Sequence, residues 1–290
     1  MTAAPAATEQ GPLALICGGG SLPLAVADSV SARGRPVLLF PLHGAADPAG
    51  MERHPHHWLY IGQAGKFRRL AFAAGCRDVV FIGSIVRPSL WQIRPDFRTL
   101  MEFSRVIAGY RGGDDHLLSA IGRIFERHGF RLLGAHDVAP EILMPEGVLG
   151  VVQPSEADRA DIALGFDYLR ATGRFDVGQA VVVAGRHVLA VEAAEGTDAM
   201  LARIAEMRAK GRVRVPAGKG VLVKAPKAGQ DRRFDLPSIG PRTVEAAVRA
   251  GLAGIAVAAG SSVVAEPEQL IGAANRAKVF VLGAPAETKR

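Results

Sequence analysis

The segment from Gly220 to Thr243 constrains the fold more than any other part of the chain, because it joins an apolar run to a rigid, charged loop. Residues Gly220 to Val223 form the apolar run, which predicts a buried strand. Prolines and glycines disfavour a regular helix or strand across most of the loop that follows: Pro226, Gly229, Pro237, Gly240 and Pro241. Folds of the α/β class present their chemistry at the ends of buried strands in this way, so the segment predicts an α/β fold.

The charged residues of this loop favour a ligand that carries phosphate. Four are cations and two are carboxylates: Lys224, Lys227, Arg232, Arg233, Asp231 and Asp235. Cations neutralise phosphate, and carboxylates hold a metal ion or a water molecule. The alternative is a solvated turn in which arginine and aspartate pair with each other. Prolines count against that alternative, since solubility alone does not require a fixed geometry, but the residues by themselves leave both interpretations open.

The overall charge points to an anionic partner. The chain has 290 residues, a formal net charge of +7 and a pI of about 9.8. Nucleic acid, an acidic membrane surface and a phosphorylated small molecule all fit that charge. Only 6% of the residues are aromatic, and no basic stretch has aromatic residues interleaved. Because single-stranded nucleic acid needs stacking platforms, we expect no nucleic-acid partner.

Cysteine usage and the N-terminus indicate a cytoplasmic protein. Cys17 and Cys76 lie far apart in apolar segments, which is neither a disulfide framework nor a metal-binding pattern. Residues 1–11 read as a disordered polar tail without a signal sequence. No apolar run approaches the roughly 18 residues that span a bilayer, so we expect no membrane-spanning segment.

The first half of the chain predicts a parallel sheet. Strand candidates alternate with helical patterns such as Gly65–Gly75. The candidates are Leu13–Cys17, Val37–Phe40, Trp58–Ile61, Asp78–Gly83 and Phe130–Leu133. The loop after the fourth of these contains Arg87, for which a phosphate contact and an ordinary surface arginine are both open.

A glycine turn follows the first strand. Gly18, Gly19 and Gly20 precede a helical pattern, an arrangement that can place ligand oxygens on a helix N-terminus. It is not a dinucleotide fingerprint, because Pro23 stands at the third glycine position and the next strand ends without an acidic residue. We prefer nucleotide or phosphate contact and reject NAD, while a turn that serves only packing is the alternative. Asp114 and Asp115 stand at the start of another predicted helix. One of them is expected to cap that helix, and a second role in a cleft is left open.

The second half predicts a mixed α/β domain. Residues Glu146 to Glu156 read as a linker, and Ala157 to Thr172 as an amphipathic helix. Two strands, Gln179–Ala184 and His187–Ala193, follow each other without an intervening helix, which predicts a hairpin. We therefore predict two domains, residues 1–146 and 147–290. In a later helix of the second domain, Thr197 is expected to cap the N-terminus and Asp198 to face the positive end of the dipole.

Six short motifs resemble one enzyme family in order and spacing. They are CGGGSLP from Cys17, GDD from Gly113, GAHD from Gly134, GQ from Gly178, VEAAEGTDAM from Val191, and the KAPK to DLP block from Lys224. The family is the LpxI type of UDP-2,3-diacylglucosamine pyrophosphatase of lipid A biosynthesis. The resemblance extends from Leu13 to about Gly283, and the last two motifs are specific in combination. One departure is the Ala228–Gly229 turn, where the family often has proline.

The resemblance implies a fold and a reaction. It implies a Rossmann-like N-terminal domain with an open parallel sheet, a C-terminal mixed α/β domain, and a substrate cleft between them. It implies hydrolysis of the pyrophosphate bond of UDP-2,3-diacylglucosamine to UMP and 2,3-diacylglucosamine 1-phosphate (lipid X). Water is expected to attack the phosphorus on the sugar side with the help of Mg²⁺ or another divalent metal such as Mn²⁺. Asp235, in the DLP element, resembles the essential carboxylate of the family.

The residues and the resemblance together give a candidate site. Lys224, Arg233 and Asp235 are the expected catalytic residues, with Asp235 as the metal ligand or the group that orients water. The expected substrate-binding residues lie in both halves of the chain: Gly19, Gly20, Ser21, Asp114, Asp115, Gln179, Thr197, Asp198, Lys227 and Gln230. A cap alone remains the alternative at Thr197 and Asp198.

The expected partners are the diacylated substrate and an anionic inner-membrane surface, to which the protein would bind peripherally and reversibly. A homodimer is left open. Two other functions fit the same residues: a nucleotide or lipid-phosphate binding protein without catalysis, and a glycosyl- or nucleotidyl-transferase with a second substrate.

Overall fold

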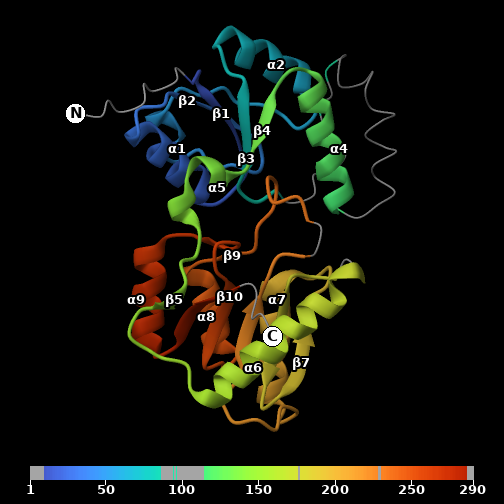
Figure 1. Cartoon of the computed structure of the whole chain (residues 1–290), viewed down its shortest axis with the longest axis vertical. Helices are drawn as coiled ribbons and strands as arrows, with labels where there is room; N and C mark the ends of the chain where they lie inside the picture. Colours follow the sequence, from blue (N-terminus) through green and yellow to red (C-terminus); the bar gives the residue numbers. More distant parts are fainter. Residues whose placement is uncertain are drawn as a thin grey trace, which may run out of the picture. The chain divides into compact units, whose positions relative to one another are not determined.

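The computed structural model describes residues 10–85, 94, 96, 114–175, 177–227 and 230–285, with the backbone alone for residues 114–119. The chain divides into two compact units (Figure 1). Unit 1 comprises Met1–Pro140 and Asp231–Phe234, and unit 2 comprises Glu141–Gln230 and Asp235–Arg290. A short piece of the charged loop therefore belongs to the first unit, whereas the residues on both sides of it belong to the second.

Unit 1 contains a four-stranded parallel sheet with the order β2-β1-β3-β4. The strands are β1 (Leu13–Cys17), β2 (Val37–Pro41), β3 (Asp78–Ile82) and β4 (Arg131–Leu133). The helices are α1 (Leu22–Ala32), α2 (Ala64–Ala73), α4 (Asp114–Arg127) and α5 (Ala135–Val138), with short 3-10 turns η1 (Met51–Arg53) and η3 (Pro140–Ile142). The expected parallel sheet is confirmed.

Both faces of the central strand are covered, because every residue of β1 is buried. Side chains of α2 and α4 pack on one face, in a core rich in phenylalanine that includes Phe40, Phe67, Phe125 and Phe130. Helices α1 and α5 lie side by side (Figure 1). Right-handed crossovers place α1 on the face opposite α2, since β2 and β3 lie on opposite sides of β1.

The predicted strand Trp58–Ile61 is not a strand. The segment makes only isolated bridges with the β2 region, Leu39 with His56 and Leu42 with Leu59. The Leu59 amide donates to the Pro41 carbonyl at 2.9 Å, but Pro41 has no amide with which to donate to this segment, so the ladder between the two bridges is interrupted. The segment instead presents aromatic side chains beside the end of β2.

Unit 2 contains a mixed six-stranded sheet with the order β5-β12-β10-β8-β6-β7. The strands are β5 (Gly147–Leu149), β6 (Ala180–Ala184), β7 (His187–Val191), β8 (Val221–Lys224), β10 (Gly254–Ala258) and β12 (Phe280–Ala284). Strands β8, β10 and β12 are parallel, and β6 is antiparallel to both of its neighbours. The predicted hairpin is thus confirmed as β6 and β7. A separate parallel pair joins β9 (Ser238–Ile239) and β11 (Val263–Val264).

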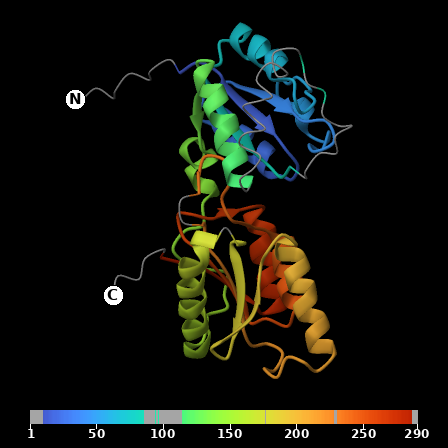
Figure 2. The ribbon, with the colours of Figure 1, turned by 90° about the vertical axis from the view of Figure 1, so that its right-hand side faces the viewer.

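Helices cover both faces of this sheet (Figure 2). Helix α6 (Glu156–Thr172) packs on one face, where Gly165 allows close contact because a Cβ there would meet Val223 at 2.5 Å. On the other face lie α7 (Gly196–Ala209), α8 (Pro241–Arg249) and α9 (Pro267–Ala277), around buried Met200, Leu222 and Ile255. A 3-10 turn, η4 (Gly173–Phe175), follows α6.

The predicted linker, Glu146–Glu156, is partly a strand. Its residues 147–149 form β5, which pairs antiparallel with β12 through Val148 and Leu282. The glycines that suggested flexibility instead allow the chain to turn at the start and after the end of β5, since Gly147 and Gly150 adopt positive φ angles of 102° and 92°. Unit 2 begins at Glu141, ahead of that segment. Among the described residues, no helix is long and apolar enough to cross a membrane.

Candidate functional site

The sheet of unit 2 brings three predicted segments together at one end of its strands, which we call the edge of the unit 2 sheet. Lys224 ends β8 and is paired in register with Ala180, so Gln179 lies just outside the start of β6. Because β7 runs antiparallel to β6, its end at Val191 lies at the same edge, and Glu192 follows directly. The polar side chains of three sequence-distant segments therefore converge beyond one end of an apolar sheet.

Glu192 is the anchor of this edge. Its side chain is buried, and its two carboxylate oxygens accept hydrogen bonds from the backbone amide of Gln179 at 2.9 Å and from the Thr197 hydroxyl at 2.7 Å. Gly178 makes the approach possible, because a Cβ there would lie 2.5 Å from Cγ of Glu192. The expectation that Thr197 caps α7 is wrong: the N-cap is Glu195, and Thr197 lies inside the first turn with its hydroxyl bound to Glu192.

Lys224 is a buried lysine at the end of a strand rather than the first residue of a solvated loop. Only 6% of it is exposed, and its Nζ donates to the Ser238 carbonyl at 3.0 Å. Loss of water around the ammonium lowers the pKa of Lys224, while the carboxylates of Glu192, Asp235 and Asp198 act in the opposite direction. A desolvated lysine among carboxylates is a frequent feature of functional sites.

Asp235 is held by a hydrogen-bond chain within the charged loop. Gln230 is buried, and its Nε2 donates to Oδ2 of Asp235 at 2.7 Å. The Lys227 amide in turn donates to Oε1 of Gln230 at 3.0 Å. The half-buried carboxylate of Asp235 is thus oriented by a neutral side chain, and its charge acts on Lys224. Three of the predicted residues are consequently linked.

Gln179 carries an atom that suits a ligand. Its Oε1 is buried and has no hydrogen-bond partner in the part of the chain that the structure describes. Buried polar atoms are nearly always paired, so an unpaired one at this edge is a position where a ligand donor would complete the bonding. Asp198 stands in the first turn of α7, as expected, where it is exposed and lies 3.8 Å from Arg242.

Arg233 takes part in a different group of residues. It belongs to unit 1, where it pairs with Asp231 at 2.7 Å and with Glu126 at 2.7 Å. The hydrogen bond to Asp231, and then the one to Glu126, raise the pKa of Arg233, and the same contact lowers the pKa of Asp231. This is the arginine–aspartate pairing that the sequence offered as an alternative, so the catalytic role of Arg233 stays a prediction.

In the glycine turn of unit 1, Gly19 is closely packed and Gly20 is open to solvent. The Gly19 amide donates to the Ser84 carbonyl at 2.7 Å, and a Cβ at this position would lie 2.8 Å from the Ala45 carbonyl oxygen. Packing therefore accounts for Gly19. Gly20 has a φ of 91°, and a Cβ there would meet nothing within 4 Å, so its backbone faces open space. Ser21 is the N-cap residue of α1 without a side-chain capping bond.

Other predicted residues lie at the limits of the structure. Helix α4 is described from Asp114 onward, so its predicted start stays a prediction, and the side chains of Asp114 and Asp115 lie outside the described residues. Arg87 also lies outside them. Sequence reasoning missed Glu192 as a functional residue, although the available signal was an acidic residue directly after a strand and before the GTD turn.

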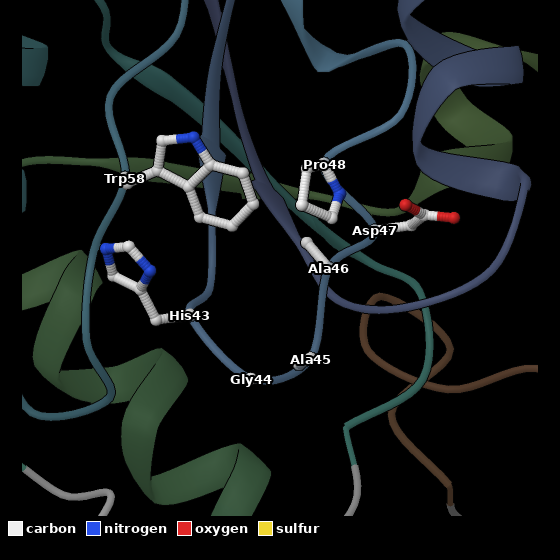
Figure 3. A pocket seen from close by; sticks show the side chains of 7 residues that line it. All are labelled: His43, Gly44, Ala45, Ala46, Asp47, Pro48 and Trp58. Atoms are coloured by element: carbon white, nitrogen blue, oxygen red, sulfur yellow. The ribbon is translucent and has the colours of Figure 1, made fainter.

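A shallow hollow lies in unit 1, beyond the end of β2 (Figure 3). It is lined by His43, Gly44, Ala45, Ala46, Asp47, Pro48 and Trp58. The His43 ring stacks against Trp58 and Tyr60, with centroids 4.9 Å and 4.2 Å apart. This hollow belongs to unit 1, whereas the Glu192, Lys224 and Asp235 cluster belongs to unit 2.

The candidate site supplies few side chains that could bind a metal ion without the substrate. Within the described ranges, no group of three histidine, cysteine, aspartate or glutamate side chains is arranged to hold a metal ion. Mg²⁺ usually binds one or two carboxylates and completes its shell with water and substrate phosphate oxygens. The oriented carboxylate of Asp235 fits that mode of binding.

Comparison with known proteins gives two matches that together span most of the chain. The family model described as the LpxI N-terminal domain matches residues 12–142, and the one described as the LpxI C-terminal domain matches residues 145–282. A curated relative from Caulobacter vibrioides, UDP-2,3-diacylglucosamine pyrophosphatase LpxI, is 44% identical over 271 residues. That alignment covers 93% of this chain and 96% of the relative.

Proposed function

This chain belongs to the LpxI family, and on that premise we propose that it hydrolyses the pyrophosphate bond of UDP-2,3-diacylglucosamine in lipid A biosynthesis. The products are UMP and 2,3-diacylglucosamine 1-phosphate. The name of the relative supplies the substrate, and similarity over nearly the whole of both chains supports its transfer. The observation that carries the proposal is the cluster of Lys224, Glu192 and Asp235 at the edge of the unit 2 sheet.

The chemistry of pyrophosphate cleavage suits this cluster. Negative charge builds on the phosphoryl oxygens and on the departing phosphate in the transition state. Lys224 offers a cation that is already desolvated, so stabilising that charge costs little rearrangement. The Gln230 side chain fixes one oxygen of Asp235 and leaves the carboxylate oriented for its role. Lys227 and Arg233 are further cations on the same loop.

Asp235 is the residue that we assign to metal or water. Where Mg²⁺ or Mn²⁺ is bound, Asp235 together with the substrate phosphate oxygens would hold it, and the ion would supply charge neutralisation. The attacking water is directed to the phosphorus on the sugar side, which leaves UMP as the departing group.

The remaining groups of the edge serve binding. Gln179 presents an acceptor without a partner in the described structure, and Thr197 is held at the start of α7 by Glu192. Asp198, at the same helix start, is suited to a hydroxyl of the sugar or the ribose. Gly19, Gly20, Ser21, Asp114 and Asp115 are the expected contacts in the Rossmann-like unit 1.

A diacylated substrate requires access to a membrane. We place the enzyme at the cytoplasmic face of the inner membrane, bound peripherally through its net charge of +7 to anionic lipid. Polybasic attraction of this kind is reversible and weakens with salt. A homodimer is compatible with this arrangement.

Purified protein incubated with UDP-2,3-diacylglucosamine and Mg²⁺ tests the proposal. Release of UMP together with 2,3-diacylglucosamine 1-phosphate supports hydrolysis, and loss of that release with EDTA supports the metal. A binding protein would retain the substrate without product, whereas a transferase would release UMP only when an acceptor is added.

A further inference from the structure

The carboxyl ends of the strands in unit 1 meet at a topological switch point. From β1 the chain turns to β2 on one side of the sheet and later to β3 on the other. Ligands of open parallel sheets bind in the crevice that opens at such a point. Three turns meet there: Gly18–Gly20 after β1, residues 43–48 after β2, and Gly83–Ser84 after β3. The first and third are joined by a bridge between Gly19 and Ser84.

A stack of aromatic rings borders this crevice. His43 lies against Trp58 with an interplanar angle of 27° and against Tyr60 with an angle of 28°, and the guanidinium of Arg94 lies 4.2 Å from the Tyr60 ring centroid. Backbone contacts fix the stack, since the His43 amide donates to the Leu59 carbonyl at 2.9 Å. Lys66 Nζ also donates to the Trp58 carbonyl at 3.1 Å. The rings therefore form a positioned platform rather than a group of loose surface side chains.

The platform forms one wall of the hollow lined by residues 43–48 and Trp58. Trp58 and Pro48 flank the hollow on opposite sides, with Ala46 between them (Figure 3). The same loop packs on the glycine turn, because the Ala45 carbonyl oxygen would lie 2.8 Å from a Cβ on Gly19. The hollow thus adjoins the turn that contains the open backbone of Gly20.

The chemistry of the lining favours a neutral, planar ring. The seven lining residues include no lysine or arginine, so the hollow itself is not built for phosphate. Trp58 and Pro48 offer flat apolar surfaces, while the Asp47 carboxylate points away from Trp58 and accepts a hydrogen bond from the Ala49 amide at 2.9 Å. Uracil is a planar ring with two π faces. A long acyl chain would need an extended apolar slot instead.

We propose that the hollow beside Trp58 is the uracil subsite, in which the base stacks on Trp58 while ribose and phosphate extend toward the Gly20 turn. This inference rests on the proposed function for the presence of a uridine nucleotide. It assigns Trp58 as a binding residue that determines the preference for the base.

Paired ligands test the base contact directly. UMP and ribose 5-phosphate differ only in the base, and their affinities for the full chain are measured by calorimetry. Stacking of a base on an aromatic side chain changes affinity about 5- to 150-fold, and a pyrimidine belongs near the lower end of that range. We expect UMP to bind about tenfold more tightly than ribose 5-phosphate, and Trp58→Ala to remove most of that difference. Trp58→Phe keeps a ring and should keep most of it.

Phe175→Ala is the matched control, because Phe175 is an exposed aromatic residue of unit 2 that packs with Arg174. It should leave the UMP to ribose 5-phosphate ratio unchanged. Equal binding of the two ligands to the wild-type protein would overturn the proposal. So would an equal loss of both in Trp58→Ala, or a loss confined to 2,3-diacylglucosamine 1-phosphate, which would make the sugar-lipid end the occupant.

A second measurement needs no variant and covers the case in which Trp58→Ala fails to fold. The ring current of an indole shifts the H5 and H6 protons of stacked uracil upfield, and NMR of UMP with the wild-type protein detects that shift. An absence of shift at saturation contradicts stacking. The hydrolysis assay separates the two claims: UMP release with no effect of Trp58 rejects only the subsite, whereas UMP stacking without hydrolysis rejects only the proposed function.

Discussion

Replacement of Glu192 by glutamine tests how the edge of unit 2 is organised. The carboxylate is buried with 7% exposure and accepts two hydrogen bonds, from the Gln179 amide and the Thr197 hydroxyl. Glutamine has nearly the same shape, and its oxygen can accept from the Gln179 amide while its Nε2 donates to the Thr197 hydroxyl, so two charge-assisted hydrogen bonds become two neutral ones. It also removes a negative charge that favours the protonated form of Lys224.

The magnitude follows from these contacts. A hydrogen bond to a charged group contributes about 1.5–3 kcal/mol and a neutral one about 0.5–1.5 kcal/mol, so each of the two bonds loses about 1 kcal/mol. Loss of the charge beside buried Lys224 adds to the cost. We therefore expect Glu192→Gln to lower the free energy of unfolding by about 2–4 kcal/mol. Because Thr197 and Gln179 are held less firmly and Lys224 loses a neighbouring charge, kcat/KM should fall about tenfold or more.

Urea unfolding and steady-state release of UMP give the two readouts. Glu195→Gln is the matched control, since Glu195 lies three residues away and makes a largely exposed ion pair with Arg203 at 2.9 Å. Exposed pairs contribute about 0–1 kcal/mol, so the control should change little. A double-mutant cycle with Thr197→Val should give a coupling energy of about 1–2 kcal/mol. If Glu192→Gln and Glu195→Gln behave alike in both assays, Glu192 does not organise the site.

Four further predictions concern the catalytic carboxylate, a buried ion pair, membrane binding and motion of the two units. Asp235→Ala should abolish turnover and leave substrate binding largely intact, since its carboxylate acts in the transition state; a folded variant that retains most activity would reject the assignment. Burial raises the pKa of Asp78, but hydrogen bonds from Arg131 and Arg35 outweigh it and the net pKa is lowered. The contribution of Asp78 to stability is therefore present above about pH 4 and is lost on acidification through the lowered pKa. Asp78→Asn should lower the free energy of unfolding by about 2 kcal/mol at neutral pH and by progressively less in acid. Urea titrations that show the same loss at every pH would contradict this expectation. Vesicle flotation should show binding to anionic lipid that high salt weakens, whereas binding indifferent to lipid charge and salt would reject the electrostatic attraction. Small-angle scattering of the free protein and of Asp235→Ala with bound substrate should differ if the units close on the ligand, and identical distance distributions would exclude closure.

Local sequence patterns predicted most of the fold. Apolar runs such as Leu13–Cys17 and Gly254–Ala258 are buried strands because strands covered on both faces need continuous apolar residues. The pattern failed at Trp58–Ile61, where the run is apolar but Pro41 of the neighbouring strand has no amide to donate and interrupts the ladder. It also failed at residues 147–149, where positive-φ glycines flank an edge strand and resemble a linker.

The candidate site was predictable in its residue types but not in its partners. The KAPK to DLP block drew attention to Lys224 and Asp235, and sequence could not show that Lys224 is buried against the Ser238 carbonyl. Glu192 was missed because its role depends on the register of the β6 and β7 hairpin, which brings it to the Gln179 amide. Arg233 was assigned from charge alone, while its pairing with Glu126 depends on a contact between residues more than a hundred positions apart.

We propose that this chain cleaves the pyrophosphate of UDP-2,3-diacylglucosamine by attack of water on the sugar-side phosphorus. Hydrolysis in ¹⁸O-labelled water, followed by mass spectrometry of both products, tests it most directly. We expect UMP without label and 2,3-diacylglucosamine 1-phosphate with one labelled oxygen. Label in UMP would contradict the direction of attack, and release of UDP or no product at all would contradict the assigned reaction.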